Sequence, residues 1–374
     1  MSGAGGLSLD GLSLSLIRRV MDAAAPGAIN LALGEPTHET PAAVRRVLAE
    51  AADEPLRYTP NGGLPELRRA LAARRPWHGG GTESALVTVG SQEALALAVL
   101  GLVRGGDEVL VPRWAYPSYE ALPRMVGATV VRAEVDEMPA AVGERTRLVI
   151  VGSPANPTGE VVSADTWRRL AALADERGFH LVSDEVYEDL YLGDTPPAIP
   201  RGRNVLHVGG VSKSLAATGL RLGWLIADPE IVARLLPLHQ HLVTCAPMVS
   251  QRAALAGLAL PAADREPIRD LYRARWSCVR SALEAVPGFT WIEPAGAYYV
   301  WMDVRARLAG STAEYALDSA KRGEVLVVPG EAFGAEGRGR LRLSFAAGEE
   351  EIEEGVQRLD AALKRAAALN AHAP

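Results

Sequence analysis

Lysine is scarce in this sequence of 374 residues, although basic residues in general are not. Lysine and arginine together number 39, yet only Lys213, Lys321 and Lys364 are lysines. Arginine keeps its proton at any useful pH, whereas a lysine amine can lose its proton and form a Schiff base with an aldehyde. A position that remains lysine against this bias is therefore a candidate for chemistry.

The three lysines differ in their sequence surroundings. Lys213 lies in a turn of small and polar residues that directly follows the apolar run 205–208. Lys321 precedes Gly323 at a predicted helix C-terminus, where a cation suits the helix dipole. Lys364 lies in an Ala- and Leu-rich terminal segment and is expected to be a solvated charge on a helix. Lys213 is the candidate nucleophile, although a lone lysine in a turn also fits a plain surface role.

Cysteine is also scarce, and long apolar runs and an excess of positive charge are absent from the sequence. Two cysteines, Cys245 and Cys278, make neither a disulfide framework nor a metal-ligand spacing, so we expect free thiols, a reducing compartment and no metal. No apolar run reaches transmembrane length, and residues 1–10 lack the charged start of a signal peptide. We therefore expect no membrane partner and a cytoplasmic location. The formal net charge of −6 predicts no nucleic-acid partner.

Short apolar segments alternate with helical patterns through most of the chain. This alternation predicts an α/β fold with a mostly parallel central sheet and helices on both faces. A Pro-Gly pair at 287–288 ends the pattern, and the later residues predict a smaller α+β domain. We expect an N-terminal arm and part of the small domain at 1–40, a large domain at 41–285 and a small C-terminal domain at 286–374. Predicted strands include 108–112, 128–132, 148–151, 179–183, 204–208, 298–303, 325–328 and 340–345, and Thr40 is predicted to cap a helix that runs to about residue 52.

Polar residues follow the ends of several predicted strands. Ser91, Asn156, Asp184 and Lys213 each come just after an apolar segment. In parallel sheets ligands bind beyond the carboxyl ends of the strands, so these four residues are expected to share one cleft. Residues 90–92 also open a helix, and their free N–H groups suit a phosphate, although a plain β–α connection would look the same.

Taken together, these residues fit pyridoxal 5′-phosphate. That cofactor carries an aldehyde, a phosphate and a pyridine nitrogen. A Schiff-base lysine suits the aldehyde, a phosphate-binding helix start suits the phosphate, and an isolated carboxylate at a strand end suits the nitrogen. Asp184 would pair with the protonated pyridine nitrogen and keep the ring an electron sink. Asp184 alone would be read as an exposed acid, but its combination with Lys213 and Ser91 favours the cofactor.

Several motifs in one order extend this interpretation. They are Asn156-Pro157-Thr158-Gly159, Ser183-Asp184-Glu185-Val186-Tyr187, Ser212-Lys213 followed by Gly219-Leu220-Arg221-Leu222-Gly223, Tyr58 with Gly62-Gly63-Leu64-Pro65, Pro329-Gly330-Glu331-Ala332-Phe333-Gly334, and Arg342-Leu343-Ser344-Phe345. On these motifs the sequence from about residue 31 to residue 345 resembles the fold-type I pyridoxal-phosphate enzymes, close to the class I/II aminotransferases. The resemblance implies the large cofactor-binding domain and the smaller domain expected above.

The resemblance implies a role for each candidate residue. Lys213 would hold the cofactor as a Schiff base and then move the proton, a role that needs a lowered amine pKa. Asp184 would keep the pyridine nitrogen protonated, and Arg342 would bind the substrate carboxylate bidentately. The other implied contacts are Asn156 and Tyr187 at the ring oxygen, Tyr116 stacked on the ring, Gly90, Ser91, Gln92, Ser212 and Arg221 at the phosphate, and Gly34 with Asn156 at the substrate.

Two further points follow from the resemblance. Tyr58 would reach the phosphate of the neighbouring subunit, which implies a homodimer with shared active sites. Many relatives carry a hydroxyl three residues before the lysine, where this chain has Gly210, so one phosphate contact is expected to be weaker.

Three functions compete at this stage. The first is an aminotransferase that moves an amino group between an L-amino acid and a 2-oxo acid. The second is another reaction on the same cofactor, such as a C–S lyase, because the same residues would serve it. The third is an effector domain of a transcription regulator, which would need a DNA-binding domain and a basic face. The substrate side chain is not readable, and the candidate contacts to it are the N-terminal arm, Thr37-His38 and Tyr298-Tyr299.

Overall fold

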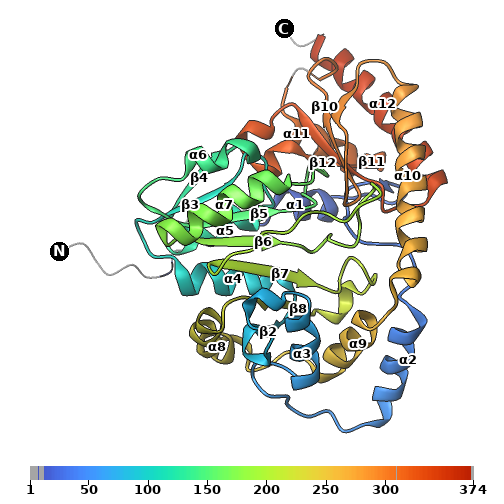
Figure 1. The fold of residues 1–374 in the computed structure, drawn as a ribbon. Helices are drawn as coiled ribbons and strands as arrows, with labels where there is room; N and C mark the ends of the chain where they lie inside the picture. The colour runs from blue at the N-terminus through green and yellow to red at the C-terminus, as the bar shows by residue number, and fades with distance from the viewer. Residues whose placement is uncertain (1–6, 8–11, 309, 372–374) are drawn as a thin grey trace.

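The computed structural model describes residues 7, 12–308 and 310–371, and a seven-stranded sheet forms its centre (Figure 1). The strand order is β2-β8-β7-β6-β5-β3-β4. Neighbours from β4 through β7 pair parallel, whereas β8 is antiparallel to both β2 and β7. The predicted α/β class with a mostly parallel sheet is confirmed. The strands are β2 Ala85–Thr88, β3 Glu108–Pro112, β4 Thr129–Ala133, β5 Thr146–Gly152, β6 His180–Asp184, β7 Val205–Gly210 and β8 Gly223–Ile226.

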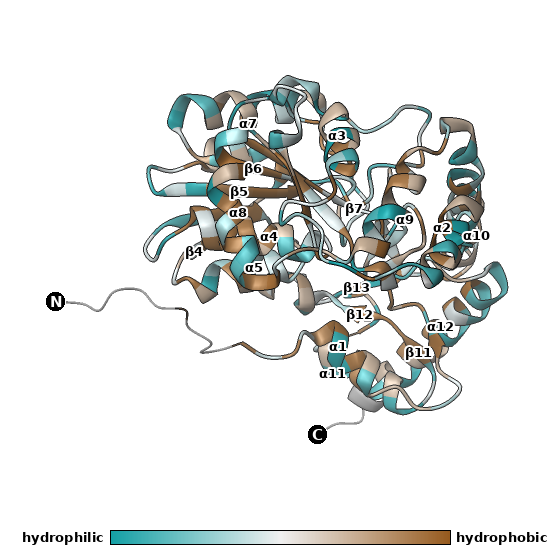
Figure 2. Ribbon diagram, turned by 90° about the horizontal axis from the view of Figure 1, so that it is seen from below, coloured by the Kyte–Doolittle hydropathy of each residue, from teal (hydrophilic) through white to brown (hydrophobic). Residues whose placement is uncertain are grey.

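Helices cover both faces of this sheet, and the strands between them are strongly apolar (Figure 2). In β5, Ile150 packs with α4, α5 and α8 on one face, whereas Val149 packs with α6 and α7 on the other. Burial on both faces explains why the strand reads as a continuous apolar run rather than an alternating one. The helices are α2 Ala42–Glu50, α3 Pro65–Ala73, α4 Ser91–Leu102, α5 Ser118–Met125, α6 Met138–Ala141, α7 Ala164–Arg177, α8 Pro229–Val243 and α9 Met248–Leu258.

The remaining elements form a second layer around a four-stranded antiparallel sheet of order β12-β13-β10-β9. The N-terminal strand β1 pairs parallel with β11, so Ile29 lies opposite Val325. Helix α1 lies beside α11 in both ribbon views (Figures 1 and 2). The elements are α1 Leu16–Asp22, β1 Ile29–Asn30, α10 Glu266–Glu284, β9 Thr290–Ile292, β10 Tyr299–Asp303, α11 Thr312–Lys321, β11 Val325–Leu326, β12 Val328–Pro329, β13 Arg340–Ser344 and α12 Glu349–Ala371.

Local sequence signals place several helix ends, with one error. Ser163 accepts a hydrogen bond from the Thr166 N–H and begins α7, and Gly178 ends that helix at a φ of 74°. The prediction that Thr40 caps α2 is wrong. Pro41 stands at the N-cap, and the Thr40 hydroxyl instead donates to the Ala216 carbonyl at 3.0 Å. A tertiary partner thus takes the hydroxyl that the local pattern assigned to the helix. Among the described residues, no helix is long and apolar enough to cross a membrane.

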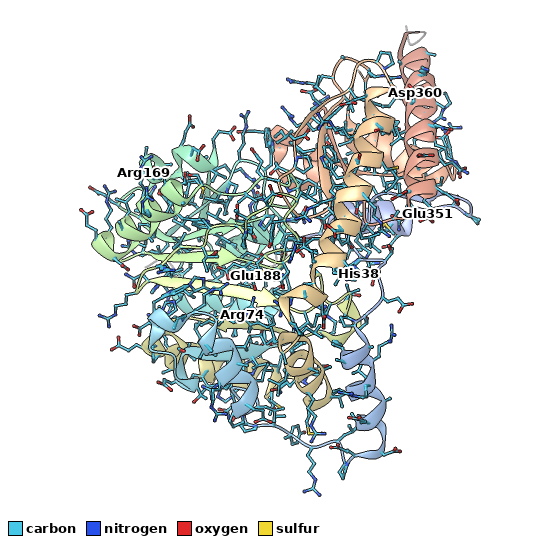
Figure 3. The ribbon with its side chains drawn as sticks, turned by 45° about the vertical axis from the view of Figure 1, so that its right-hand side comes forward. His38, Arg74, Arg169, Glu188, Glu351 and Asp360 are labelled. Atoms are coloured by element: carbon cyan, nitrogen blue, oxygen red, sulfur yellow. The ribbon has the colours of Figure 1, made fainter. Side chains whose placement is uncertain are left out.

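A buried ionic network fixes the end of β6. Glu185 accepts a hydrogen bond from Arg75 at 2.5 Å and shares one with His207 of β7 at 2.7 Å. Arg74 and Glu188 add a second ion pair between α3 and the segment after β6, and Figure 3 labels both residues. The network ties α3, β6 and β7 together immediately beside Asp184.

Candidate active site

A cavity of about 650 Å³ lies at the carboxyl ends of β5, β6 and β7. It brings together most of the residues that the sequence assigned to the site, although they come from distant parts of the chain. Gly90 lies at the edge of the cavity, at the start of α4, and Tyr58 lies outside it, with 88% of its surface exposed. The predicted residues that line the cavity are Gly34, Ser91, Gln92, Tyr116, Asn156, Asp184, Tyr187, Ser212, Lys213, Arg221 and Arg342.

The Lys213 amine lies in the cavity and donates a hydrogen bond to the Gly34 carbonyl at 2.5 Å. Burial lowers the pKa of Lys213, and the nearby charges of Arg342 and Arg221 lower it further, while Tyr299 and Glu35 oppose them. A lowered pKa increases the fraction of neutral amine, which is the nucleophilic form.

Asp184 is the last residue of β6, and its carboxylate is buried beneath the cavity. Tyr119 of α5 donates to its Oδ2 at 2.7 Å, and the Val186 N–H approaches Oδ1 at 3.4 Å. Burial raises the pKa of Asp184 to about 6, and the neighbouring Glu185 adds to the increase. A buried carboxylate, for which no described residue supplies a cationic partner, therefore lies on the cavity wall, where it fits a protonated ring nitrogen.

An anion site opens at the start of α4. Gly90 takes a φ of 77°, and no hydrogen bond among the described residues uses the N–H groups of Ser91 and Gln92. A Cβ at Gly223 would lie 2.4 Å from the Ser91 nitrogen, so only glycine lets β8 pass this close. Arg221 takes a left-handed φ of 49°, and its guanidinium lies beside Gly90. A helix N-terminus with an adjacent arginine suits a phosphate.

Arg342 also lines the cavity and belongs to β13. Its Nη1 donates to Asn156 Oδ1 at 2.9 Å, its Nη2 donates to the Ala32 carbonyl, and the Tyr299 ring lies 4.2 Å from the guanidinium carbon. Its Nε is buried, and no described residue accepts a hydrogen bond from it. A buried, fixed guanidinium with an unused donor fits a carboxylate ligand.

Tyrosines surround the amine. Tyr187 and Tyr299 share a hydroxyl–hydroxyl hydrogen bond of 2.8 Å, and Tyr298 donates to the Gly34 carbonyl at 2.7 Å. A Cβ at Gly34 would lie 1.9 Å from the Tyr299 hydroxyl, which explains why this position needs glycine. Tyr116 donates to Gln92 Oε1 at 3.3 Å. Its ring thereby stands beside the anion site.

Sequence reasoning missed some residues that the structure places in the cavity. Tyr119 received no role, although it lies only three residues after Tyr116, and the two rings meet edge-on with their centroids 5.9 Å apart. Ile17, Arg18 and Met21 of α1 also line the cavity. The sequence contained no signal for them beyond the general expectation that the N-terminal arm contacts the substrate.

The family of the chain follows from comparison with known proteins. Residues 26–359 match the model of the family described as aminotransferase class I and II. The chain belongs to this family.

Individual members of the family are similar in sequence or structure to this chain over nearly its whole length. The aspartate aminotransferase of Streptomyces avermitilis is 33% identical, covering 95% of this chain and 94% of that protein. Aromatic-amino-acid aminotransferase 2 of Thermococcus litoralis is 31% identical, covering 95% and 97%. A tetra mutant of Thermus thermophilus aspartate aminotransferase complexed with tryptophan superposes with a TM-score of 0.86 at 30% identity, covering 96% and 99%.

The protein is therefore a pyridoxal-phosphate-dependent aminotransferase, and the function and cofactor expected from the sequence are confirmed. Its substrates are an amino acid and a 2-oxo acid. The lyase alternative is not favoured, because the named relatives are aminotransferases. The cavity fits the cofactor on its own evidence: an unpaired buried carboxylate, unused amides at a helix start and a lysine amine surround one space.

Proposed function

We propose that Lys213 is the residue that carries the cofactor as a Schiff base and moves the proton during amino transfer. When bound, pyridoxal phosphate supplies an aldehyde and a ring that stores the electron pair released from the substrate. The observation that supports the proposal most directly is the position of the Lys213 amine. It lies in one cavity with the Asp184 carboxylate and the Arg342 guanidinium. Its lowered pKa suits an amine that must accept and release a proton.

The other residues bind and orient. Asp184 would hold a proton-bearing ring nitrogen, and Tyr119 keeps its carboxylate directed toward the cavity. Asn156 and Tyr187 would contact the ring oxygen, and Tyr116 would lie against the ring. Gly90, Ser91, Gln92, Ser212 and Arg221 would hold the phosphate. Arg342, with Asn156 and Gly34, would bind the α-carboxylate of the substrate.

The active unit that we propose is a homodimer. Tyr58 and Leu56 are 88% and 76% exposed, and Leu242 is 51% exposed at the end of α8. Asn61 donates to the Thr244 carbonyl at 2.8 Å, which joins the two segments into one surface. Exposed large apolar residues on one surface are typical of an interface. On this proposal Tyr58 contacts the phosphate held by the partner.

The two-domain division is also proposed, with a large domain at 41–285 and a small domain at 286–374, and with residues 1–40 as the N-terminal arm and part of the small domain. Helix α10, although it falls within 41–285, packs with the core of the second layer. The parallel pairing of β1 with β11 supports the place of the N-terminal segment. A cytoplasmic location is proposed because Cys245 and Cys278 form no disulfide, as is usual in a reducing compartment.

Borohydride reduction followed by mass spectrometry of the digested holoenzyme tests the central role of Lys213. We expect a cofactor-derived mass addition on the peptide that contains Lys213 and on no peptide that contains Lys321 or Lys364. The Lys213→Ala variant is the negative control, because it has no amine at this position to be labelled. Labelling of a different lysine, or equal labelling of the variant, would overturn the assignment.

A further inference from the structure

We propose that this aminotransferase prefers neutral amino acids with apolar side chains to the dicarboxylic amino acids. The inference rests on the proposed function, because it concerns the part of the same cavity that receives the substrate side chain. It goes further by assigning that part to α1 and to the segment after β1, and by naming the chemical class that they recognise.

Helix α1 and the segment after β1 contribute three large apolar residues to the cavity wall. Ile17 and Met21 are one helical turn apart on α1, so both side chains lie on one face of the helix, and both line the cavity. They are half-buried because they also pack against the core of the second layer. Leu33 completes the wall, and 37% of its surface stays exposed.

Leu33 lies between two residues whose backbone carbonyls hold side chains of the site. The carbonyl of the preceding residue, Ala32, holds Arg342, and the carbonyl of the following residue, Gly34, holds Lys213. A substrate whose carboxylate meets Arg342 and whose amino group lies near Lys213 therefore stands against this segment. Its side chain meets Leu33, Ile17 and Met21.

The charges of the lining oppose a second carboxylate. Among the described residues, the cations on the cavity wall are Lys213, Arg221, Arg342 and Arg18. The first three have the roles proposed above. The Arg18 side chain is 65% exposed and faces Asp22 at 3.6 Å, so it is a solvated surface pair. Glu35 also lines the cavity and adds a negative charge.

A carboxylate at the end of the substrate side chain would therefore lose water without gaining a buried cation from the described residues of its own subunit. Burying an ionised carboxylate without a partner is strongly unfavourable, whereas an apolar group gains from the same burial. Met21 has a flexible, unbranched side chain, so the wall can adapt to aliphatic, thioether and aromatic substrates.

Single-turnover kinetics of the holoenzyme test the inference directly. The cofactor absorbance is followed after mixing with L-leucine, L-methionine, L-phenylalanine or L-aspartate, without any 2-oxo acid. We expect the best apolar amino acid to react with a second-order rate constant about 100-fold above that of aspartate. Aspartate reacting as fast as the best apolar amino acid would overturn the inference and leave the proposed function intact. If no amino acid changes the cofactor, the proposed function itself fails.

Two variants test the position of the apolar wall. Ile17→Arg and, on a more exposed residue, Leu33→Arg each place a cation beside the substrate side chain. Each is expected to raise the ratio of aspartate to leucine rate constants at least about tenfold. The matched control, Arg19→Ala, changes an exposed residue of α1 that does not line the cavity, and should leave the ratio unchanged. If both folded arginine variants keep the wild-type ratio, the side-chain subsite lies elsewhere.

Equilibrium binding provides a readout independent of turnover. Unreactive carboxylic acids are compared by the increase they give in the melting temperature of the holoenzyme. 4-Methylpentanoate and 3-phenylpropanoate should stabilise it more than succinate at equal concentration. Stronger stabilisation by succinate, lost in Arg18→Ala, would identify Arg18 as the cation for a second carboxylate and overturn the proposal.

Discussion

The Tyr119 hydroxyl donates a hydrogen bond to Asp184 Oδ2 at 2.7 Å, from a helix on one face of the sheet to the end of its central strand β6. Both side chains are buried, and burial raises the pKa of each. The bond orients the carboxylate and offsets part of the effect of burial, since it lowers the pKa of Asp184. On the proposed function, Tyr119 is thus a positioning residue that orients Asp184 toward the cofactor's ring nitrogen.

Replacing Tyr119 should weaken the binding of the cofactor without unfolding the protein. In Tyr119→Phe the carboxylate loses a hydrogen bond to a charged acceptor, worth about 1.5 kcal/mol. We expect the cofactor dissociation constant to increase about tenfold and the acid limb of the pH–rate profile to move to higher pH. Titration of the apoprotein with cofactor and a pH series measure the two effects. Tyr191→Phe, remote from the cavity, is the control, and identical behaviour of the two variants would contradict the positioning role.

The raised pKa of Asp184 predicts a pH dependence of stability in the apoprotein. The folded-state pKa of about 6 exceeds the ordinary value of 3.8, so this group favours folding below about pH 3.8. The contribution disappears as the pH increases through 6, where the buried charge costs about 3 kcal/mol relative to the neutral form. Apo Asp184→Asn should therefore be more stable than the wild-type apoprotein at pH 7.5, with a smaller difference at pH 4.5.

Urea unfolding at the two pH values measures this difference, and the asparagine keeps an acceptor for Tyr119. With cofactor present the order should reverse at pH 7.5, because the variant loses the charge that pairs with the ring nitrogen. If the apo variant is less stable than the wild-type apoprotein at pH 7.5, burial does not destabilise the ionised Asp184 carboxylate.

Gly34 should tolerate no side chain. Its Cβ would meet the Tyr299 hydroxyl at 1.9 Å, and Tyr299 in turn contacts Tyr187 and Arg342. Gly34→Ala is expected to displace Tyr299, to lower kcat/KM for amino acids at least about tenfold and to lower the melting temperature, because overpacking against the buried Tyr299 costs about 1–3 kcal/mol. Gly193→Ala is the matched control, because nothing lies within 4 Å of its Cβ position. Equal activity of the two variants would refute the packing argument.

Arg342 should not be replaceable by lysine. Its guanidinium is held by Asn156 and Ala32 and offers a planar set of donors, which an ammonium group cannot reproduce. We expect Arg342→Lys to increase KM for the amino acid and to reduce kcat/KM about 100-fold, while cofactor binding stays near wild type. The conservative control is Arg338→Lys, at an exposed position. A loss of cofactor affinity as large as the loss of kcat/KM would place Arg342 in the cofactor site instead.

Mixed dimers test whether Tyr58 acts on the partner's site. In a hybrid of Lys213→Ala and Tyr58→Ala subunits, one site would combine an intact Lys213 with the intact Tyr58 of the other chain. Mixing the two inactive or weakened proteins under conditions of subunit exchange should therefore restore activity. No recovery, in a mixture shown to contain hybrids, would mean that Tyr58 does not act across an interface.

Lys213, Asp184 and Asn156 could be predicted because parallel strands bring their carboxyl ends to one edge of a sheet. That argument needs only the order of apolar segments and the polar residue after each. The alignment of β5, β6 and β7 then brings the three residues into one cavity. The scarcity of lysine singled out Lys213 independently of the sheet. This argument depends on the chemistry of the lysine amine and needs no knowledge of packing.

The contacts that sequence reasoning missed all depend on tertiary partners. The hydrogen bond of Tyr119 depends on how α5 rotates against the sheet, and the place of Ile17 depends on how α1 packs beside α11. Thr40 was assigned to a helix cap because its tertiary partner, the Ala216 carbonyl, lies far away in the sequence. Gly210 shows the converse: a Cβ there would lie 3.0 Å from the Leu222 carbonyl, so strand packing accounts for a residue that looked only like a lost phosphate contact.

The most direct test of the account is an absorbance scan of the purified holoenzyme before and after addition of a single amino acid. We expect a visible cofactor band that fades when an apolar L-amino acid is added and returns when a 2-oxo acid follows, and no such cycle in Lys213→Ala. A band that survives while ammonia and an oxo acid accumulate would contradict amino transfer. Absence of any band from wild-type protein supplied with pyridoxal phosphate would contradict the assignment of the cavity itself.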